Sequence, residues 1–283
     1  MFASSTAPRV VVGVDGSRAA LKAAYWAVDE ALDRELPLGL LCAVDSGSPG
    51  ANAAAAAETA VRSAMAAIEA LDRPPKLEAE IVHRRPVTAL LEASRSAAVI
   101  CLGSIGFHHE PGSRVGSTAT AVATSAHCPV AIVPRTFTAR TGHAGLVLAV
   151  VDGSSAGDGV LELGAAEARL RGLPLRVFAL PQHRPAAPGE SDVPSDPPLP
   201  TAVDRWLSRC RQEHPDLDVD SVGYHEGLLN CFERLQRSGS AIQLAVVAPR
   251  RPGPLDVLLA PAGRAVVESA GSAVLVCDRT WWL

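Results

Sequence analysis

Glycine, serine and threonine residues gather in one segment whose spacing could bind an anion. Gly103 and Gly106 follow an apolar run, and after nine further residues comes Gly116, followed by Ser117 and Thr118. Glycines let a backbone approach a phosphate closely, and Ser or Thr at a helix start places a hydroxyl beside free N–H groups. Each residue alone is typical of an ordinary turn or helix cap. The full set predicts a phosphate-binding loop between a strand and a helix.

An acidic side chain is expected beside this loop. Asp15 comes directly after the apolar run Val10–Val14, which reads as a β-strand. In an open α/β sheet, ligands bind outside the carboxyl ends of the strands, so Asp15 and the glycine-rich segment predict one site. The loop also contains His108, His109 and Glu110. Because adjacent side chains rarely converge on one ion, we predict no structural metal there.

The chain consists of two copies of one unit. Both copies begin with an apolar run that ends in Asp-Gly-Ser, VVGVDGS at Val11–Ser17 and LAVVDGS at Leu148–Ser154. The copies also end alike, since Ser125–Val133 aligns with Ser269–Cys277. A polar, glycine-containing stretch between the copies is typical of a linker. The sequence therefore predicts a tandem duplication.

Strand-length apolar runs alternate with helical patterns in each copy, which predicts a parallel sheet with helices on both faces. We predict an α/β fold of two doubly wound, five-stranded parallel-sheet domains, over residues 1–138 and 144–283. Pro181–Pro200 is rich in proline and is expected to be a loop. In the first copy the expected strands are Val10–Val14, Leu38–Val44, Leu77–His83, Ala98–Gly103 and Val130–Val133. The expected helices are one capped by Ser17, Ala51–Leu71, Val87–Ala97 and Ser117–Ser125.

The spacing Gly103-x2-Gly106-x9-Gly116-Ser117 resembles the ATP-binding motif of the universal stress protein family, G-x2-G-x9-G-[S/T]. The Val-Asp-Gly-Ser start, the first helix and the Cys-Pro-Val lead into the last strand extend the resemblance along the chain. It implies two domains of the adenine nucleotide alpha hydrolase-like fold in a pseudo-twofold tandem. Their last strands are then expected to lie side by side and antiparallel, which covers two sheet edges.

The same resemblance implies a role for each site residue. Asp15 is expected at the ribose or adenine end of ATP, and the backbone at Ala43 is expected to hold the adenine. The residues expected around the phosphates are Gly103, Gly106, Gly116, Ser117 and Thr118. Mg²⁺ is expected to accompany ATP, because it often binds through substrate phosphates.

The second copy departs from the motif. It keeps Asp152, but Ala260 and Pro261 align with Gly116 and Ser117. The stretch after its fourth strand is rich in proline, which removes backbone donors that a phosphate needs. We therefore predict one competent nucleotide site, in the first domain, and a degenerate second domain.

Composition excludes several classes of function. A net charge of −4 at pH 7 and 4% aromatic residues argue against a nucleic-acid binder. No apolar run approaches the roughly 18–20 residues of a membrane helix, and no signal peptide is recognisable, so we expect a cytoplasmic protein. The six cysteines form no CxxC pair and are expected to be reduced and structural. The charged run of Asp29, Glu30, Asp33, Arg34 and Glu35 is typical of a solvated helix end and turn.

We predict a tandem universal stress protein that binds ATP in its N-terminal domain and regulates a stress or dormancy response through protein partners. A homodimer of tandem chains is expected from the resemblance. No Ser/His/Asp set and no acidic residue placed to activate water are recognisable, so we expect at most slow ATP hydrolysis. Two alternatives stay open: a stress adaptor that binds no nucleotide, and a weak ATPase or nucleotide-transferring enzyme.

Overall fold

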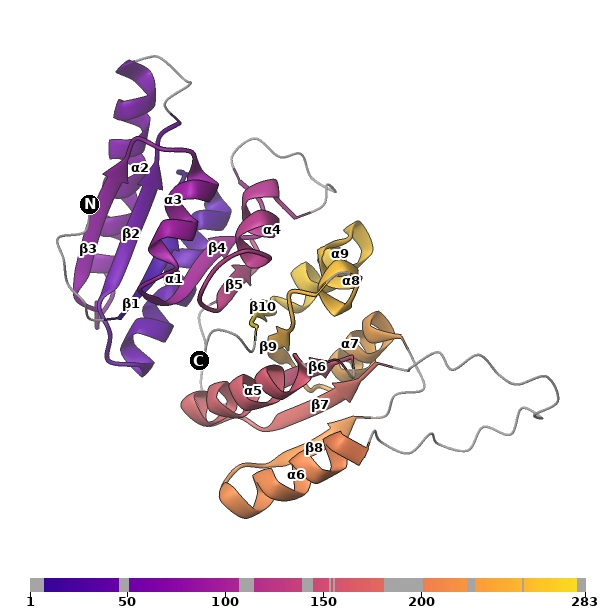
Figure 1. Ribbon diagram of the computed structural model, residues 1–283. Helices are drawn as coiled ribbons and strands as arrows, with labels where there is room; N and C mark the ends of the chain where they lie inside the picture. The colour runs from indigo at the N-terminus through magenta and orange to yellow at the C-terminus, as the bar shows by residue number, and fades with distance from the viewer. Residues whose placement is uncertain are drawn as a thin grey trace.

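One continuous sheet organises the chain (Figure 1). The computed structural model describes residues 8–45, 51–106, 115–138, 145–152, 154, 156–180, 201–222, 227–250 and 252–278. The ten strands in these residues pair in the order β3-β2-β1-β4-β5-β10-β9-β6-β7-β8. Their bounds are β1 Arg9–Gly13, β2 Leu38–Ala43, β3 Leu77–Val82, β4 Ala97–Gly103, β5 Val130–Val133, β6 Leu146–Val151, β7 Leu175–Ala179, β8 Val219–Val222, β9 Ile242–Val247 and β10 Ala273–Val276.

The strand order reads the same from both ends, as a duplicated unit requires. All pairs within β1–β5 and within β6–β10 are parallel, which confirms the predicted α/β fold. The units meet at β5 and β10, which pair antiparallel, with Ala131 opposite Leu275. The prediction that the last strands lie side by side is therefore confirmed, and a pseudo-twofold axis passes between them.

Helices cover both faces of the sheet (Figure 1). The helices of the first unit are α1 Arg18–Asp33, α2 Ala51–Glu69, α3 Pro86–Ala93 and α4 Ser117–Ala123. Those of the second unit are α5 Gly157–Arg171, α6 Thr201–Glu213, α7 Leu228–Arg237, α8 Pro254–Leu259 and α9 Pro261–Ala270. Ser17 caps α1 as predicted, since its Oγ accepts from the Ala20 N–H at 3.1 Å. The helix expected over Val87–Ala97 ends at Ala93, because Ala97 already belongs to β4.

The core has two layers, one on each face of the sheet, and each layer runs through both units. Alternate residues of one strand enter opposite layers, as Val10 and Val11 do. All six cysteines are buried, and none of them forms a disulfide bond. Within the described residues, no helix is both long and apolar enough to span a bilayer. The expected loop Pro181–Pro200, most of the linker and His108-His109-Glu110 lie outside the described residues.

Charged side chains of both units meet in a buried ring on the interface. Glu30 and Arg34 of α1 face Glu167 and Arg171 of α5, and each carboxylate is shared by both guanidinium groups. Glu30, Glu167 and Arg171 expose no more than 2% of their side chains, and Arg34 exposes 25%. Arg171 also lies over the Trp26 ring, 5.6 Å from its centroid. The expected solvated helix end is therefore wrong at Glu30 and Arg34, because the second unit covers it.

Burial and ion pairing have opposite effects on the pKa values of the carboxyl groups in this ring. Burial raises the pKa of Glu30 to about 7, although Arg171 and Arg34 oppose the rise. Burial also acts on Glu167, but there the two arginines prevail and lower its pKa. The pKa of Arg171 is raised because both carboxylates outweigh its desolvation. The ring is therefore stable only while all four partners compensate one another.

Candidate functional site

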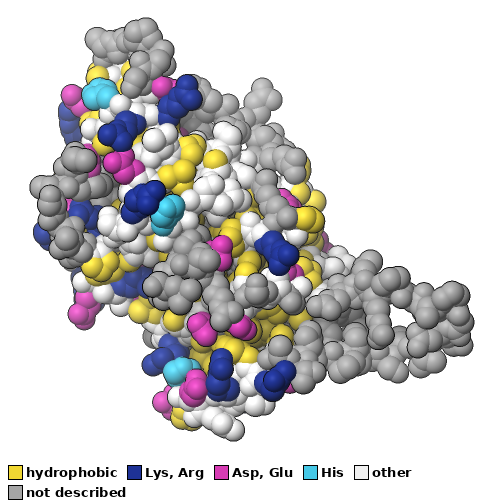
Figure 2. All heavy atoms as spheres, viewed as in Figure 1, with side chains coloured by type: hydrophobic (Ala, Val, Ile, Leu, Met, Phe, Trp, Pro, Cys, Tyr) yellow, Lys and Arg dark blue, Asp and Glu magenta, His cyan; other side chains and the backbone are white. Residues whose placement is uncertain are grey.

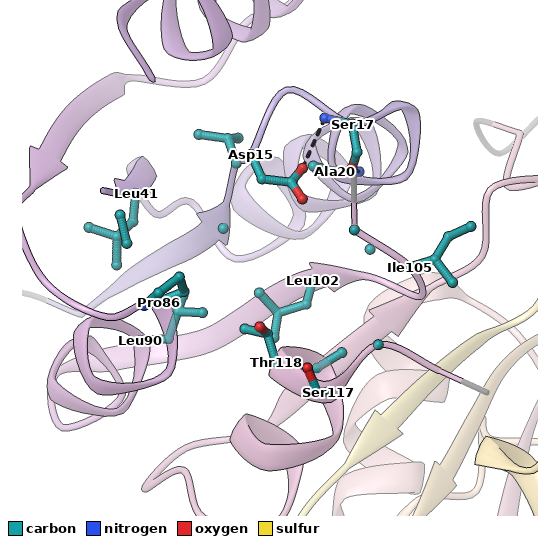
Figure 3. A pocket seen from close by; sticks show the side chains of 17 residues that line it. Asp15, Ser17, Ala20, Leu41, Pro86, Leu90, Leu102, Ile105, Ser117 and Thr118 are labelled. Carbon is teal, nitrogen blue, oxygen red and sulfur yellow. Dashed lines mark hydrogen bonds between the residues drawn. The ribbon is translucent and has the colours of Figure 1, made fainter. Parts of the chain in front are cut away.

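A hollow opens at the carboxyl ends of β1, β2 and β4 (Figure 3). Its empty volume is about 720 Å³ when the open mouth is included. Its lining includes every residue singled out from the sequence, Asp15, Ala43, Gly103, Gly106, Gly116, Ser117 and Thr118. The structure thus brings the seven residues together. Their roles toward a ligand stay a prediction.

The turn after β1 fixes the Asp15 carboxylate. Its Oδ1 accepts from the Ser17 N–H at 2.9 Å, and Gly16 between them has a φ of +80°, a conformation that favours glycine. The other oxygen, Oδ2, lies so near Gly106 that a Cβ built there would be 3.0 Å away. Asp15 is exposed, so its carboxylate faces both solvent and the backbone after β4.

Two glycines distant in sequence become neighbours here. The Gly116 N–H donates to the Ser104 carbonyl at 2.9 Å, and a Cβ built on Gly116 would lie 3.7 Å from the Gly106 nitrogen. In Figure 3 the Ser117 and Thr118 side chains lie across the hollow from Asp15 and Ser17. The glycines Gly106 and Gly116 and the hydroxyls of Ser117 and Thr118 thus line the same hollow as the Asp15 carboxylate.

Gly103 serves packing rather than the hollow alone. A Cβ built on it would be 2.6 Å from the Ala19 carbonyl carbon, so only glycine lets β4 approach α1 this closely. A Gly103→Ala variant is expected to lose about 1–3 kcal/mol of unfolding free energy, because the α1 backbone must move. Urea denaturation checks this against Gly116→Ser, whose Cβ has room and whose side chain suits the N-cap, so that stability should change by less than about 0.5 kcal/mol. Equal stability of the two variants contradicts this account.

The remaining wall of the hollow is apolar and was not predicted. Leu41, Leu90 and Leu102 line it, with Pro86 at the start of α3. In the sequence these residues are indistinguishable from ordinary core positions, and only the structure shows that they border the hollow. Among the described lining residues, Asp15 is the only ionisable one. The side chains that could donate to an anion, among the lining residues that the structure describes, are the neutral hydroxyls of Ser17, Ser117 and Thr118.

In the second unit, larger side chains occupy the positions equivalent to two residues that line the hollow of the first unit. Strand register pairs Gly13 with Leu41 in the first unit and Val150 with Phe178 in the second. Both Val150 and Phe178 are at most 1% exposed. Leu255 and Leu258 of α8 are buried in the same core layer. The space that is open in the first unit is therefore narrowed by apolar side chains in the second.

Metal-binding geometry is not seen in the part of the chain that the structure describes. No group of three or more His, Cys, Asp or Glu side chains lies close enough there to hold an ion. On the face shown in Figure 2, Lys and Arg side chains are interspersed with Asp and Glu rather than gathered in one patch.

The family model that matches this chain and its sequence relatives all belong to one family. The model of the Universal stress protein family matches residues 7–134. The chain is 43% identical to Universal stress protein Rv2028c of Mycobacterium tuberculosis, over 99% of this chain and 100% of that protein. It is 33% identical to Universal stress protein Rv2624c of the same organism, over 97% of each chain. A universal stress protein from Archaeoglobus fulgidus has a similar fold, with a TM-score of 0.67, 15% identity and coverage of 97% of this chain and 98% of that one.

Proposed function

Because this chain belongs to the universal stress protein family, we propose that its N-terminal unit binds ATP and that the bound state regulates protein partners. The observation that carries the proposal is the convergence of the glycine motif and Asp15 on one hollow. A cytoplasmic location and a homodimer of tandem chains belong to the same proposal.

The lining of the hollow divides into two parts that suit the two ends of a nucleotide. Leu41, Leu90 and Leu102 offer an apolar surface for a flat base, beside the backbone of Ala43. Asp15 is available to accept from ribose hydroxyls. This division supports adenosine at the β1–β2 side of the hollow.

The glycine-lined side suits the phosphates. At Gly106 and Gly116 no Cβ fills the space beside the backbone, so a phosphate could approach the backbone closely there. The hydroxyls of Ser117 and Thr118 add donors. Bound Mg²⁺ would neutralise part of the phosphate charge and be held chiefly by the phosphates themselves.

The second unit is proposed to be a structural partner rather than a second nucleotide site. Val150 and Phe178 occupy the positions equivalent to Gly13 and Leu41, which line the hollow of the first unit. Pro261, the first residue of α9, aligns with Ser117. Proline there offers no N–H and no hydroxyl. We expect one nucleotide per chain.

Calorimetric titration of the purified full chain with Mg-ATP tests the proposal. We expect saturable binding with a stoichiometry near one, and native mass spectrometry to detect a co-purifying adenine nucleotide. Absence of heat and of any thermal shift at millimolar ATP would establish the adaptor that binds no nucleotide. Steady ATP turnover abolished by one side-chain change would establish the enzyme.

A further inference from the structure

Ser104 is a junction between three segments of the chain. It lies between the first two glycines of the motif and is only 3% exposed. Its N–H donates to the Val133 carbonyl at 2.8 Å, and its own carbonyl accepts from the Gly116 N–H at 2.9 Å. Its hydroxyl donates to Oε1 of Glu268, which belongs to α9 of the second unit, at 2.8 Å. The position of Gly116 relative to β4 therefore depends on Ser104, and Ser104 is held by the other unit.

Glu268 is itself firmly held. Its Oε2 accepts from the backbone N–H of Thr136 at 3.3 Å, and its backbone carbonyl accepts from the Thr136 hydroxyl. Arg264, one turn earlier on α9, brings its Nε within 3.9 Å of the carboxylate. The Glu268 side chain is about 12% exposed. Its carboxylate is thus fixed before any ligand arrives.

A second bond between the units holds the other side of the glycine motif. The Val115 N–H donates to the Leu259 carbonyl, at the end of α8, at 3.4 Å. Val115 directly precedes Gly116. The second unit therefore contacts the residue next to each of the two motif segments, Ser104 on one side and Val115 on the other.

The pseudo-twofold axis provides an internal comparison. Strand register places Val11 opposite Ile100 and the equivalent Leu148 opposite Ala245, so Pro249 corresponds to Ser104. Proline has no hydroxyl to donate. Thr124, which aligns with Glu268, bonds through its hydroxyl to carbonyls of its own helix. A side-chain bond from the end of β4 to the other unit is therefore made by the unit that keeps the glycine motif, and Pro249 cannot make the equivalent bond.

We propose that Glu268 is a positioning residue by which the second unit sets the phosphate affinity of the first. This inference rests on the proposed ATP binding, and it gives the second unit a role at that site. Glu268 acts through Ser104 on the spacing of Gly103, Gly106 and Gly116. It touches none of the expected ligand atoms.

The test compares ATP with adenosine on the full chain. Ser104→Ala and Glu268→Ala are each expected to weaken ATP binding about tenfold and to leave adenosine binding unchanged, because adenosine does not use the glycine segment. The double variant is expected to lose no more than either single variant. Glu268→Gln keeps one acceptor oxygen for the Ser104 hydroxyl but turns an NH₂ group toward the Thr136 N–H, so its ATP affinity is expected to lie between those of the parent and Glu268→Ala.

Thr136→Val is the matched control, because it removes a hydroxyl that bonds to Glu268 but leaves the Ser104 bond intact. It is expected to bind ATP as the parent does. Equal weakening of ATP and adenosine, or unchanged ATP binding in Ser104→Ala and Glu268→Ala, overturns the inference.

A ligand-free measurement separates this inference from the proposed function. Amide hydrogen exchange at Gly116 is expected to be about tenfold faster in Glu268→Ala than in the parent, since the Ser104 carbonyl that holds this N–H is no longer fixed. If the parent chain binds no ATP, the proposed function is wrong and the phosphate role fails with it. Unchanged Gly116 exchange in a chain that does bind ATP shows that Glu268 does not position the loop.

Discussion

A Gly116→Asp variant is expected to bind ATP at least about 100-fold more weakly than the parent while folding normally. Gly116 is the N-cap of α4 and has no side-chain cap, and its φ of −55° suits any residue. A Cβ built there lies 3.7 Å from its nearest neighbour, the Gly106 nitrogen, which is an ordinary contact, and an aspartate favours the helix start. Its carboxylate would stand a few ångströms from the phosphates, where like charges repel by about 4 kcal/mol at an effective dielectric constant of 20. Calorimetric titration with Mg-ATP gives the ratio of dissociation constants.

Gly116→Asn is the control for charge. Asparagine has nearly the same shape and is an equally good N-cap, but it carries no charge. We expect it to lose less than about tenfold in ATP affinity, since its amide oxygen competes with phosphate for N–H groups without repelling it. If aspartate and asparagine weaken ATP equally, or if neither does, the phosphates do not lie beside Gly116.

Replacing Arg171 by methionine is expected to lower the free energy of unfolding by about 3–5 kcal/mol, the usual effect of removing one partner from a buried ion pair. The change strands Glu30 and Glu167 beside the single cation of Arg34. It also removes the contact with the Trp26 ring. Chemical denaturation at pH 8 measures the loss.

The pH dependence of this loss identifies its cause. Burial already raises the pKa of Glu30 to about 7, above its ordinary value near 4.5, and removal of Arg171 raises it further. A carboxyl with a raised folded-state pKa destabilises the fold as pH rises from the unfolded pKa to the folded one. The deficit of Arg171→Met should therefore shrink between pH 8 and pH 5. A deficit that does not change with pH indicates lost packing instead.

Arg169→Met controls for loss of an arginine from the same helix. Arg169 is exposed on α5, and its replacement is expected to change stability by less than about 0.5 kcal/mol. Replacement of all four ring residues by apolar side chains of similar volume is expected to be far milder than Arg171→Met alone, because no charge is stranded.

The sequence predicted the site better than the surface between the units. Gly103, Gly106 and Gly116 have the spacing of a known motif, and Asp15 follows a strand whose place in a doubly wound sheet is set by general rules, so the sequence predicted that these residues would lie together. Leu41 and Leu90 could not be predicted as lining, since an apolar residue reads as core whether or not a hollow lies beside it. The Ser104–Glu268 bond joins residues 164 positions apart, and local spacing carries no sign of it.

The prediction that Glu30 and Arg34 lie in a solvated helix end was wrong for a physical reason. Helical periodicity says which face of α1 a residue occupies, but it does not say what a second copy of the unit brings against that face. The available signal was the duplication itself. Glu30 with Arg34 and Glu167 with Arg171 repeat the same four-residue spacing at matching places in the two copies. Charges that recur in register about a symmetry axis favour a shared interface over two solvated ends.

The antiparallel pair of β5 and β10 has a consequence for synthesis of the chain. β5 is complete long before β10, which emerges only after about 140 further residues, or roughly 7–30 s of translation. During that interval β5 is an unpaired edge strand of the first unit. Glu30 and Arg34 have not yet met Arg171 and Glu167, which later bury them. Two nascent chains on one messenger carry the same open edge at the same time. Because an unpaired strand edge can pair with the same edge of another chain, we expect strand exchange between nascent chains to be the characteristic assembly error of this architecture.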